Sequence, residues 1–264
     1  MQIFLSVFVF VIGIVFGSFL NVLVSRLPFH ESIVRPRSRC PHCQRPIPPI
    51  ELIPVLSYLF LKGRCRGCRQ LIAWRYPAIE LSTVLLFVLC QLSFGVTRVG
   101  IFAMILCFLL LGLAATDAET LTLPNTLTYP GMVLGLIYTA SIPRALVSFR
   151  ISDVASSLFS AIGFALLILG IRWVYLKLRH VEGLGIGDAK LMAMIATWMG
   201  PLLTAEVFFI GVFAAALYGI LILIAQRGRG MQTQLPLGSF LCGAAIFVLF
   251  QGKGILKWYL QFFH

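Results

Sequence analysis

Two aspartates in this sequence lie at the edges of apolar stretches, where a carboxylate is costly unless it has a function. Asp188 ends the run Gly183-Leu184-Gly185-Ile186-Gly187-Asp188 and precedes an apolar stretch, whereas Asp117 ends another such stretch. Two carboxyl groups about 3 Å apart cannot both ionise cheaply, so they share one proton and can activate a water molecule between them. If the two aspartates meet, they predict hydrolysis of a peptide bond with Asp117 and Asp188 as the catalytic residues.

The expected helices place these two carboxylates at opposite helix ends. Asp188 lies at an N-terminus, where the helix dipole favours a negative charge, and Asp117 lies at a C-terminus, where the dipole disfavours one. We therefore predict that Asp188 carries the charge and Asp117 the proton. Taken alone, Asp188 is better explained as a helix-capping residue. Gly185 and Gly187 permit backbone angles that other residues resist, and we predict that they leave room for an extended substrate beside Asp188.

The elements that position the aspartates are expected to be membrane helices. Of the 264 residues, 59% are hydrophobic and only 11% are charged, against about 25% charged in a typical soluble domain. The composition predicts an all-α polytopic membrane protein whose partner is the lipid bilayer. Windows long enough to cross about 30 Å of hydrocarbon predict about eight spans, near residues 3–24, 77–95, 99–116, 127–142, 154–176, 189–203, 204–225 and 236–251.

The basic residues predict how these spans are oriented. With the N-terminus outside, 16 of the 21 Lys and Arg fall in or beside the inner loops and five on the other side, as the positive-inside rule requires. Asp117 and Asp188 then lie at the cytoplasmic face. The net charge is +12, but the basic residues are concentrated on the predicted inner side and do not indicate a nucleic-acid partner. We predict three regions: a first transmembrane helix (1–24), a cytoplasmic loop domain (25–76) and a transmembrane catalytic core (77–264).

Four cysteines in the cytoplasmic loop form two CxxC pairs, Cys40-Pro41-His42-Cys43 and Cys65-Arg66-Gly67-Cys68. Two such turns present four thiolates to one ion, which predicts a structural tetrahedral Zn²⁺ site. The alternatives are two disulfides or four unlinked thiols, and a reducing cytoplasm disfavours disulfides.

At this point the sequence resembles the prepilin peptidases, the bifunctional leader peptidases and N-methyltransferases of type IV pilus, type II secretion and competence systems. The resemblance covers nearly the whole chain and is carried by Gly17-Ser18-Phe19-Leu20-Asn21-Val22, Arg26-Leu27-Pro28, Ile53-Pro54, Ser57-Tyr58, Arg75-Tyr76-Pro77, the CxxC pairs, Asp117 and Gly185-Ile186-Gly187-Asp188. It implies a bacterial inner-membrane enzyme that cleaves prepilin or pseudopilin leaders after a glycine. It also implies methylation of the new N-terminus from S-adenosylmethionine, and it adds Lys190 to the expected substrate-binding residues.

Two positions depart from the pattern of that family. Pro124-Asn125 stands where Pro-Asp is usual, and Pro236-Leu237-Gly238-Ser239 stands where Pro-Phe-Gly-Pro is usual. The alternatives to the full activity are a peptidase that does not methylate, a non-catalytic scaffold, and a transporter in which the two aspartates bind protons or cations. No glycine-rich nucleotide-binding motif marks residues for the methyl donor, and no feature of the sequence indicates an oligomeric state.

Overall fold

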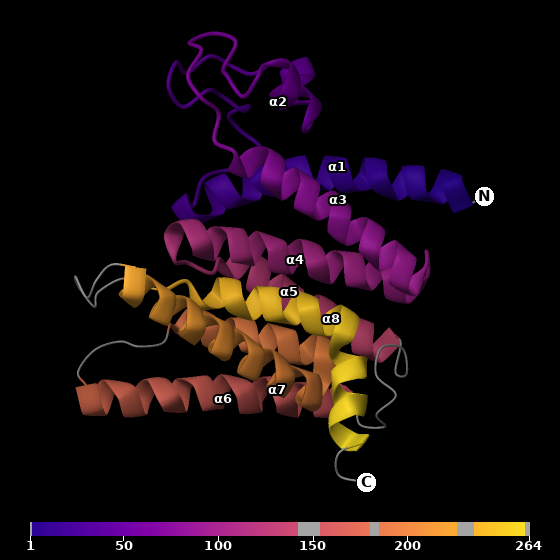
Figure 1. Cartoon of the computed structure of the whole chain (residues 1–264), viewed down its shortest axis with the longest axis vertical. Coiled ribbons are helices and arrows are strands. Elements are labelled where there is room, and N and C mark those ends of the chain that lie inside the picture. Colours follow the sequence, from indigo (N-terminus) through magenta and orange to yellow (C-terminus); the bar gives the residue numbers. More distant parts are fainter. Residues whose placement is uncertain (1, 142–153, 180–184, 226–234, 262–264) are drawn as a thin grey trace. The chain divides into compact units, whose positions relative to one another are not determined.

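The computed structural model describes residues 2–141, 154–179, 185–225 and 235–261. In these residues the secondary structure is helical apart from turns and two isolated β-bridges. The elements in chain order are α1 (Gln2–Arg26), the 3₁₀ helices η1 (Leu27–Phe29) and η2 (Pro49–Leu52), α2 (Leu56–Phe60), α3 (Arg75–Phe94), α4 (Arg98–Thr120), α5 (Asn125–Ser141), α6 (Val154–Arg179), α7 (Ile186–Ala225) and α8 (Leu237–Gln261) (Figure 1).

The predicted all-helical membrane class is confirmed. Five described helices are long and apolar enough to cross a bilayer, and α8 contains a shorter apolar segment, Leu237–Gly252. The number of eight spans stays a prediction, because α5 has only 17 residues and the windows 189–203 and 204–225 fall within the single element α7. The chain forms two compact units, Met1–Gly112 and Leu113–His264. The three predicted regions divide the chain differently and also remain predictions.

The first unit is built on the packing of α1 against α3. Glycines permit close approach of the two backbones: a Cβ atom at Gly17 would lie 2.8 Å from the Cα of Glu80, and one at Gly13 would lie 3.0 Å from the Cα of Val84. Small residues of this kind are what membrane helices use to approach one another, since no hydrophobic force drives their association in lipid.

A buried carboxylate joins the loop segment 27–74 to this helix pair. The Oε2 atom of Glu80 in α3 accepts the backbone N–H of Val55, the residue that precedes α2, at 2.8 Å. Asn21 of α1 donates from its side chain to the carbonyl of Tyr76 at 3.0 Å. Glu80 is only 8% exposed. The cost of burying its carboxylate is offset by the hydrogen bond from Val55, whose N–H at the start of α2 has no partner within that helix.

The second unit is centred on α7, which packs against α5, α6 and α8 (Figure 1). Two helical segments of α7 meet at Gly200, whose φ of 72° and ψ of −176° interrupt the helix directly before Pro201. Such a break leaves carbonyl groups without helical donors, and in a bilayer they need partners from the protein. Thr139 Oγ1 donates to the carbonyl of Thr197 at 2.9 Å, and Thr204 Oγ1 donates to that of Gly200 at 2.5 Å.

The contact between α5 and α7 fixes the segment that carries Asp188. Trp198 Nε1 donates to the carbonyl of Gly131 in α5 at 2.8 Å. Gly135 lies so close to α7 that a Cβ atom there would be 2.7 Å from Cδ1 of Trp198. Nearly all residues from Asp188 to Gly200 are buried. The first segment of α7 is therefore a rigid support for a side chain at its N-terminus.

Candidate active site and metal centre

The structure places Asp117 and Asp188 in the same compact unit. Asp117 lies in the last turn of α4 and Asp188 in the first turn of α7. Their exposed fractions are 5% and 8%, so both carboxyl groups are buried at helix ends within one compact unit. Two buried carboxyl groups that come together can share one proton. Their catalytic role remains a proposal, which is developed below.

The side chain of Asp117 is held by the first turn of α8. Its Oδ2 atom accepts the backbone N–H of Ser239 at 2.6 Å and lies 3.0 Å from the hydroxyl of Ser239. The dipole argument from the sequence used only the C-terminus of α4, whereas the carboxylate also faces the N-terminus of α8. The helix ends therefore do not decide by themselves which aspartate carries the proton. The sequence analysis did not predict this role of Ser239. The unusual motif at residues 236–239 was the feature that pointed to this position.

The side chain of Asp188 has a structural partner as well. Its Oδ2 atom accepts the backbone N–H of Gly185 at 3.0 Å. An acid in the first turn of a helix that reaches back to a preceding N–H is the acidic half of a capping box. The capping hypothesis for Asp188 thus agrees with the geometry, and so does a catalytic role. An asparagine substitution separates them, because an amide oxygen can still accept this hydrogen bond but cannot act as a base.

Leu123 packs between the N-termini of α7 and α8. A Cβ atom at Gly187 would lie 3.3 Å from Leu123, and one at Gly238 would lie 3.1 Å from Leu123 and 3.0 Å from both Cγ and Oδ2 of Asp117. The absence of a side chain at Gly238 therefore lets α8 approach Asp117. The substrate contacts predicted for Gly185 and Gly187 remain predictions, and Gly238 is a further position that the sequence did not single out.

Lys190, the third expected substrate-binding residue, contacts the first turn of α5. Its Nζ atom donates to Oδ1 of Asn125 at 2.9 Å and lies 5.5 Å from the centre of the Tyr129 ring. The aspartate that is usual at position 125 in the family that this sequence resembles would form an ion pair with this ammonium group, whereas the asparagine leaves the positive charge uncompensated at this contact. Lys190 thus presents a cation two residues beyond Asp188, and its contact with substrate stays a prediction.

The four cysteines of the loop converge on one point. The sulfur atoms of Cys40, Cys43, Cys65 and Cys68 all lie within 4.8 Å of one another, and those of Cys40 and Cys68 are 3.8 Å apart. Four sulfurs about 2.3 Å from one Zn²⁺ ion at tetrahedral angles would be about 3.8 Å apart. A disulfide requires about 2.05 Å, and all four cysteines are free. The donor set and its spacing therefore fit a tetrahedral zinc ion.

The two CxxC turns have the same backbone construction. In each, the N–H of the first cysteine bonds to a carbonyl five residues later, and the residue four positions after that cysteine, Gln44 or Arg69, has a φ of 56°. Glu51 joins the two turns, since its Oε1 atom lies 3.2 Å from the Arg45 guanidinium and 3.5 Å from that of Arg66. The turns thus present their sulfurs symmetrically and are cross-linked outside the sulfur cluster.

The thiols of the cluster differ in how easily they ionise. Backbone N–H groups of Cys68 and Gly67 lower the pKa of the Cys65 thiol to about 6. The N–H of Gln70 lowers the pKa of Cys68, but burial and the neighbouring thiols outweigh it and raise this pKa to about 11. Four adjacent sulfurs cannot all become thiolates unless a cation compensates their charge. This supports a divalent metal as the group that the cluster binds.

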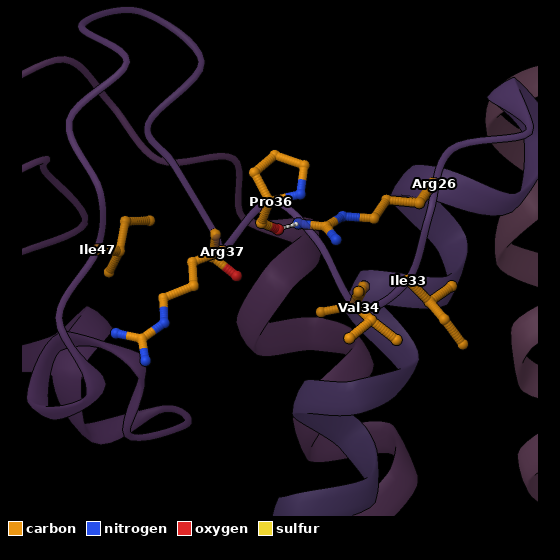
Figure 2. A pocket seen from close by; sticks show the side chains of 8 residues that line it. Arg26, Ile33, Val34, Pro36, Arg37 and Ile47 are labelled. Atoms are coloured by element: carbon orange, nitrogen blue, oxygen red, sulfur yellow. Dashed lines mark hydrogen bonds between the residues drawn. The ribbon is translucent and has the colours of Figure 1, made fainter.

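A pocket of about 320 Å³ lies beside the C-terminal end of α1 (Figure 2). It is lined by Val22, Arg26, Ile33, Val34, Pro36, Arg37, Ser38 and Ile47. Arg26 donates to the carbonyls of Ser32 and Pro36 at 2.8 and 2.7 Å, so its guanidinium is already engaged. The lining contains no acidic side chain for ribose hydroxyls or a positive sulfonium. It therefore does not fit S-adenosylmethionine, and we assign the methyl donor no residues.

Comparison with known proteins identifies the family of this chain. Residues 11–94 match the Bacterial Peptidase A24 N-terminal domain, and residues 104–220 match the Type IV leader peptidase family. The chain belongs to this family of leader peptidases, as the sequence motifs predicted. In the comparison with solved structures, none matches the chain.

Several relatives carry the name Prepilin leader peptidase/N-methyltransferase. That of Aeromonas hydrophila is 32% identical over 97% of this chain and 93% of its own length, and that of Bacillus subtilis is 34% identical over 96% of each. That of Myxococcus xanthus is 39% identical over 87% of this chain and 66% of its own length. These comparisons give the transporter alternative no support.

Proposed function

We propose that this protein is a membrane aspartic endopeptidase that removes the leader from prepilins or pseudopilins after a glycine and then methylates the new N-terminus. Family membership and the names of the relatives support the two activities. The observation that carries the peptidase proposal is the pair of buried aspartates, Asp117 and Asp188, at the ends of two helices of the same compact unit.

The proposed hydrolysis uses one proton shared by the two carboxyl groups. The ionised carboxylate takes a proton from a water molecule as this water attacks the scissile carbonyl carbon, and the protonated partner donates to the carbonyl oxygen. As the tetrahedral intermediate collapses, the carboxyl group that took the water proton gives it to the leaving amine. The other carboxylate takes back a proton from the hydroxyl that becomes the new carbonyl group, which returns the pair to its starting state. Gly185 and Ser239 hold the two carboxylates through hydrogen bonds, and Gly185, Gly187 and Lys190 are the proposed substrate contacts.

The substrate class explains why the site lies where it does. A prepilin-like substrate has a basic leader on the cytoplasmic side and an apolar helix in the bilayer, so its scissile bond lies near the cytoplasmic boundary. The distribution of basic residues supports a cytoplasmic position for the ends of α4 and α7 that carry the aspartates. We therefore place the enzyme in the bacterial inner membrane with its catalytic face toward the cytoplasm.

Two cofactors are proposed. Zn²⁺ held by Cys40, Cys43, Cys65 and Cys68 would be structural, because four protein thiolates leave no open position for substrate or water. S-adenosylmethionine would supply the methyl group, as the N-methyltransferase name of the relatives suggests.

Co-expression with a prepilin, followed by mass spectrometry of the pilin N-terminus, tests both activities at once. We expect Asp117→Asn and Asp188→Asn each to abolish leader cleavage, because an amide cannot activate water as a base. The double variant should be hardly worse than either single one, since the two residues act as a unit. The exposed Glu119, two residues from Asp117, is the matched control, and Glu119→Gln should cleave normally.

A purely capping role for Asp188 predicts the opposite result. The amide oxygen of asparagine can still accept the hydrogen bond from Gly185, so near-normal cleavage by Asp188→Asn at matched expression would contradict the catalytic assignment. The catalytic assignment would also be contradicted if Glu119→Gln were inactive while Asp117→Asn remained active.

A further inference from the structure

Two polar groups lie within hydrogen-bond distance of the hydroxyl of Ser239, and both belong to α4. Its Oγ atom lies 3.0 Å from Oδ2 of Asp117 and 2.9 Å from the carbonyl oxygen of Ala114, one turn earlier in α4. The N–H of the same serine donates to Oδ2 of Asp117 at 2.6 Å. A hydroxyl has one proton and can also accept hydrogen bonds. It therefore cannot donate to Asp117 and Ala114 at the same time.

We propose that Ser239 is a positioning residue that holds Asp117 in both of its protonation states. When Asp117 is ionised, the hydroxyl and the N–H of Ser239 both donate to Oδ2. When Oδ2 is protonated, its O–H donates to Oγ of Ser239, and the serine proton turns to the carbonyl of Ala114. Ser239 keeps its own proton and only its hydroxyl rotates, while Asp117 exchanges its proton with the reacting groups and not with the serine.

This exchange rests on the proposed peptidase function, in which each carboxyl group gains and loses a proton in every catalytic cycle. Asp117 is 5% exposed, so water is a poor substitute for a missing partner, and a buried polar group without a partner is costly. The N–H group alone can stabilise only the ionised state. A proline at this position would offer neither donor, so the arrangement depends on the serine.

The test compares Ser239→Thr with Ser239→Val, because the two side chains have nearly the same shape and only threonine has a hydroxyl. We expect the threonine variant to keep kcat for prepilin cleavage within about threefold of the unmodified protein. The valine variant, like Ser239→Ala, should lower kcat about 10- to 100-fold, the range expected for a lost hydrogen bond to a charged group. KM should change less than about twofold, since Ser239 holds Asp117 and not the substrate.

Equal kcat values for the threonine and valine variants, or a change confined to KM, would overturn this role. The melting temperatures of the purified variants show whether both fold, and Ser239→Ala gives a second comparison without β-branching. Cleavage by the unmodified protein and its loss in Asp117→Asn establish the peptidase function separately. If Asp117→Asn cleaves normally, the proposed function fails; if it is inactive while Ser239→Val is fully active, only the role of Ser239 fails.

Discussion

Substitution of Gly238 by alanine tests how closely α8 must approach Asp117. The new Cβ atom would lie 3.0 Å from Cγ and Oδ2 of Asp117 and 3.1 Å from Cδ1 of Leu123. Ordinary contacts between such atoms begin near 3.5 Å, so the carboxylate must move by about 0.5 Å or α8 must shift. Because a misplacement of about 1 Å can cost about 100-fold in rate, we expect kcat to fall about 10-fold, which is about 1.4 kcal/mol.

Gly243 in the same helix provides the matched control. A Cβ atom at Gly243 would meet nothing within 4 Å, so Gly243→Ala should cleave like the unmodified protein. Both substitutions gain up to about 1 kcal/mol of helix propensity, which works against a loss of stability as the cause of any defect. The assay is the initial rate of prepilin processing at saturating substrate, with the melting temperature measured beside it. Indistinguishable kcat values for the two variants would refute the close-approach argument.

Two further predictions concern the metal cluster and Lys190. Purified protein should contain about one equivalent of zinc; Cys65→Ser should reduce this content and expose segment 25–76 to proteolysis, and metal should be released as the pH falls because protons compete for the thiolates. Stoichiometric disulfides without metal, in protein from a reducing cytoplasm, would contradict this. Lys190→Met should raise KM for prepilin several-fold and leave kcat nearly unchanged, because it removes a contact that we assign to substrate binding. An unchanged KM in steady-state cleavage assays would remove Lys190 from the site.

The sequence predicted those features that depend on neighbouring residues. Apolar windows located most helix ends to within about four residues, although α4 extends to Thr120 and so includes Asp117. The last window ended at residue 251, whereas α8 continues to Gln261. The two CxxC pairs predicted a convergence of sulfurs that the structure contains, because each turn fixes its own pair of thiols. The motif around Asp188 gave the family, which the comparisons confirm.

What the sequence could not supply are contacts between distant segments. Ser239 and Asp117 are 122 residues apart, and Lys190 and Asn125 are 65 apart. Such pairs form only when helices pack, and no local periodicity encodes them. For the same reason, the prediction that Asp117 carries the proton considered only the end of α4 and not the N-terminus of α8. The departures at 124–125 and 236–239 marked the relevant positions, but only the packed structure shows which partners they have.

The break at Gly200 relates this enzyme to the thickness of its membrane. The segment of α7 that carries Asp188 runs from Ile186 to Met199, and at 1.5 Å per residue it rises only about 21 Å. The hydrocarbon layer is about 30 Å thick, so this segment is too short to match it. A bilayer accommodates a short segment by thinning around it, and thinning brings headgroups and water closer to the carboxylates. We therefore expect lipids with shorter acyl chains to give water easier access to the two carboxyl groups.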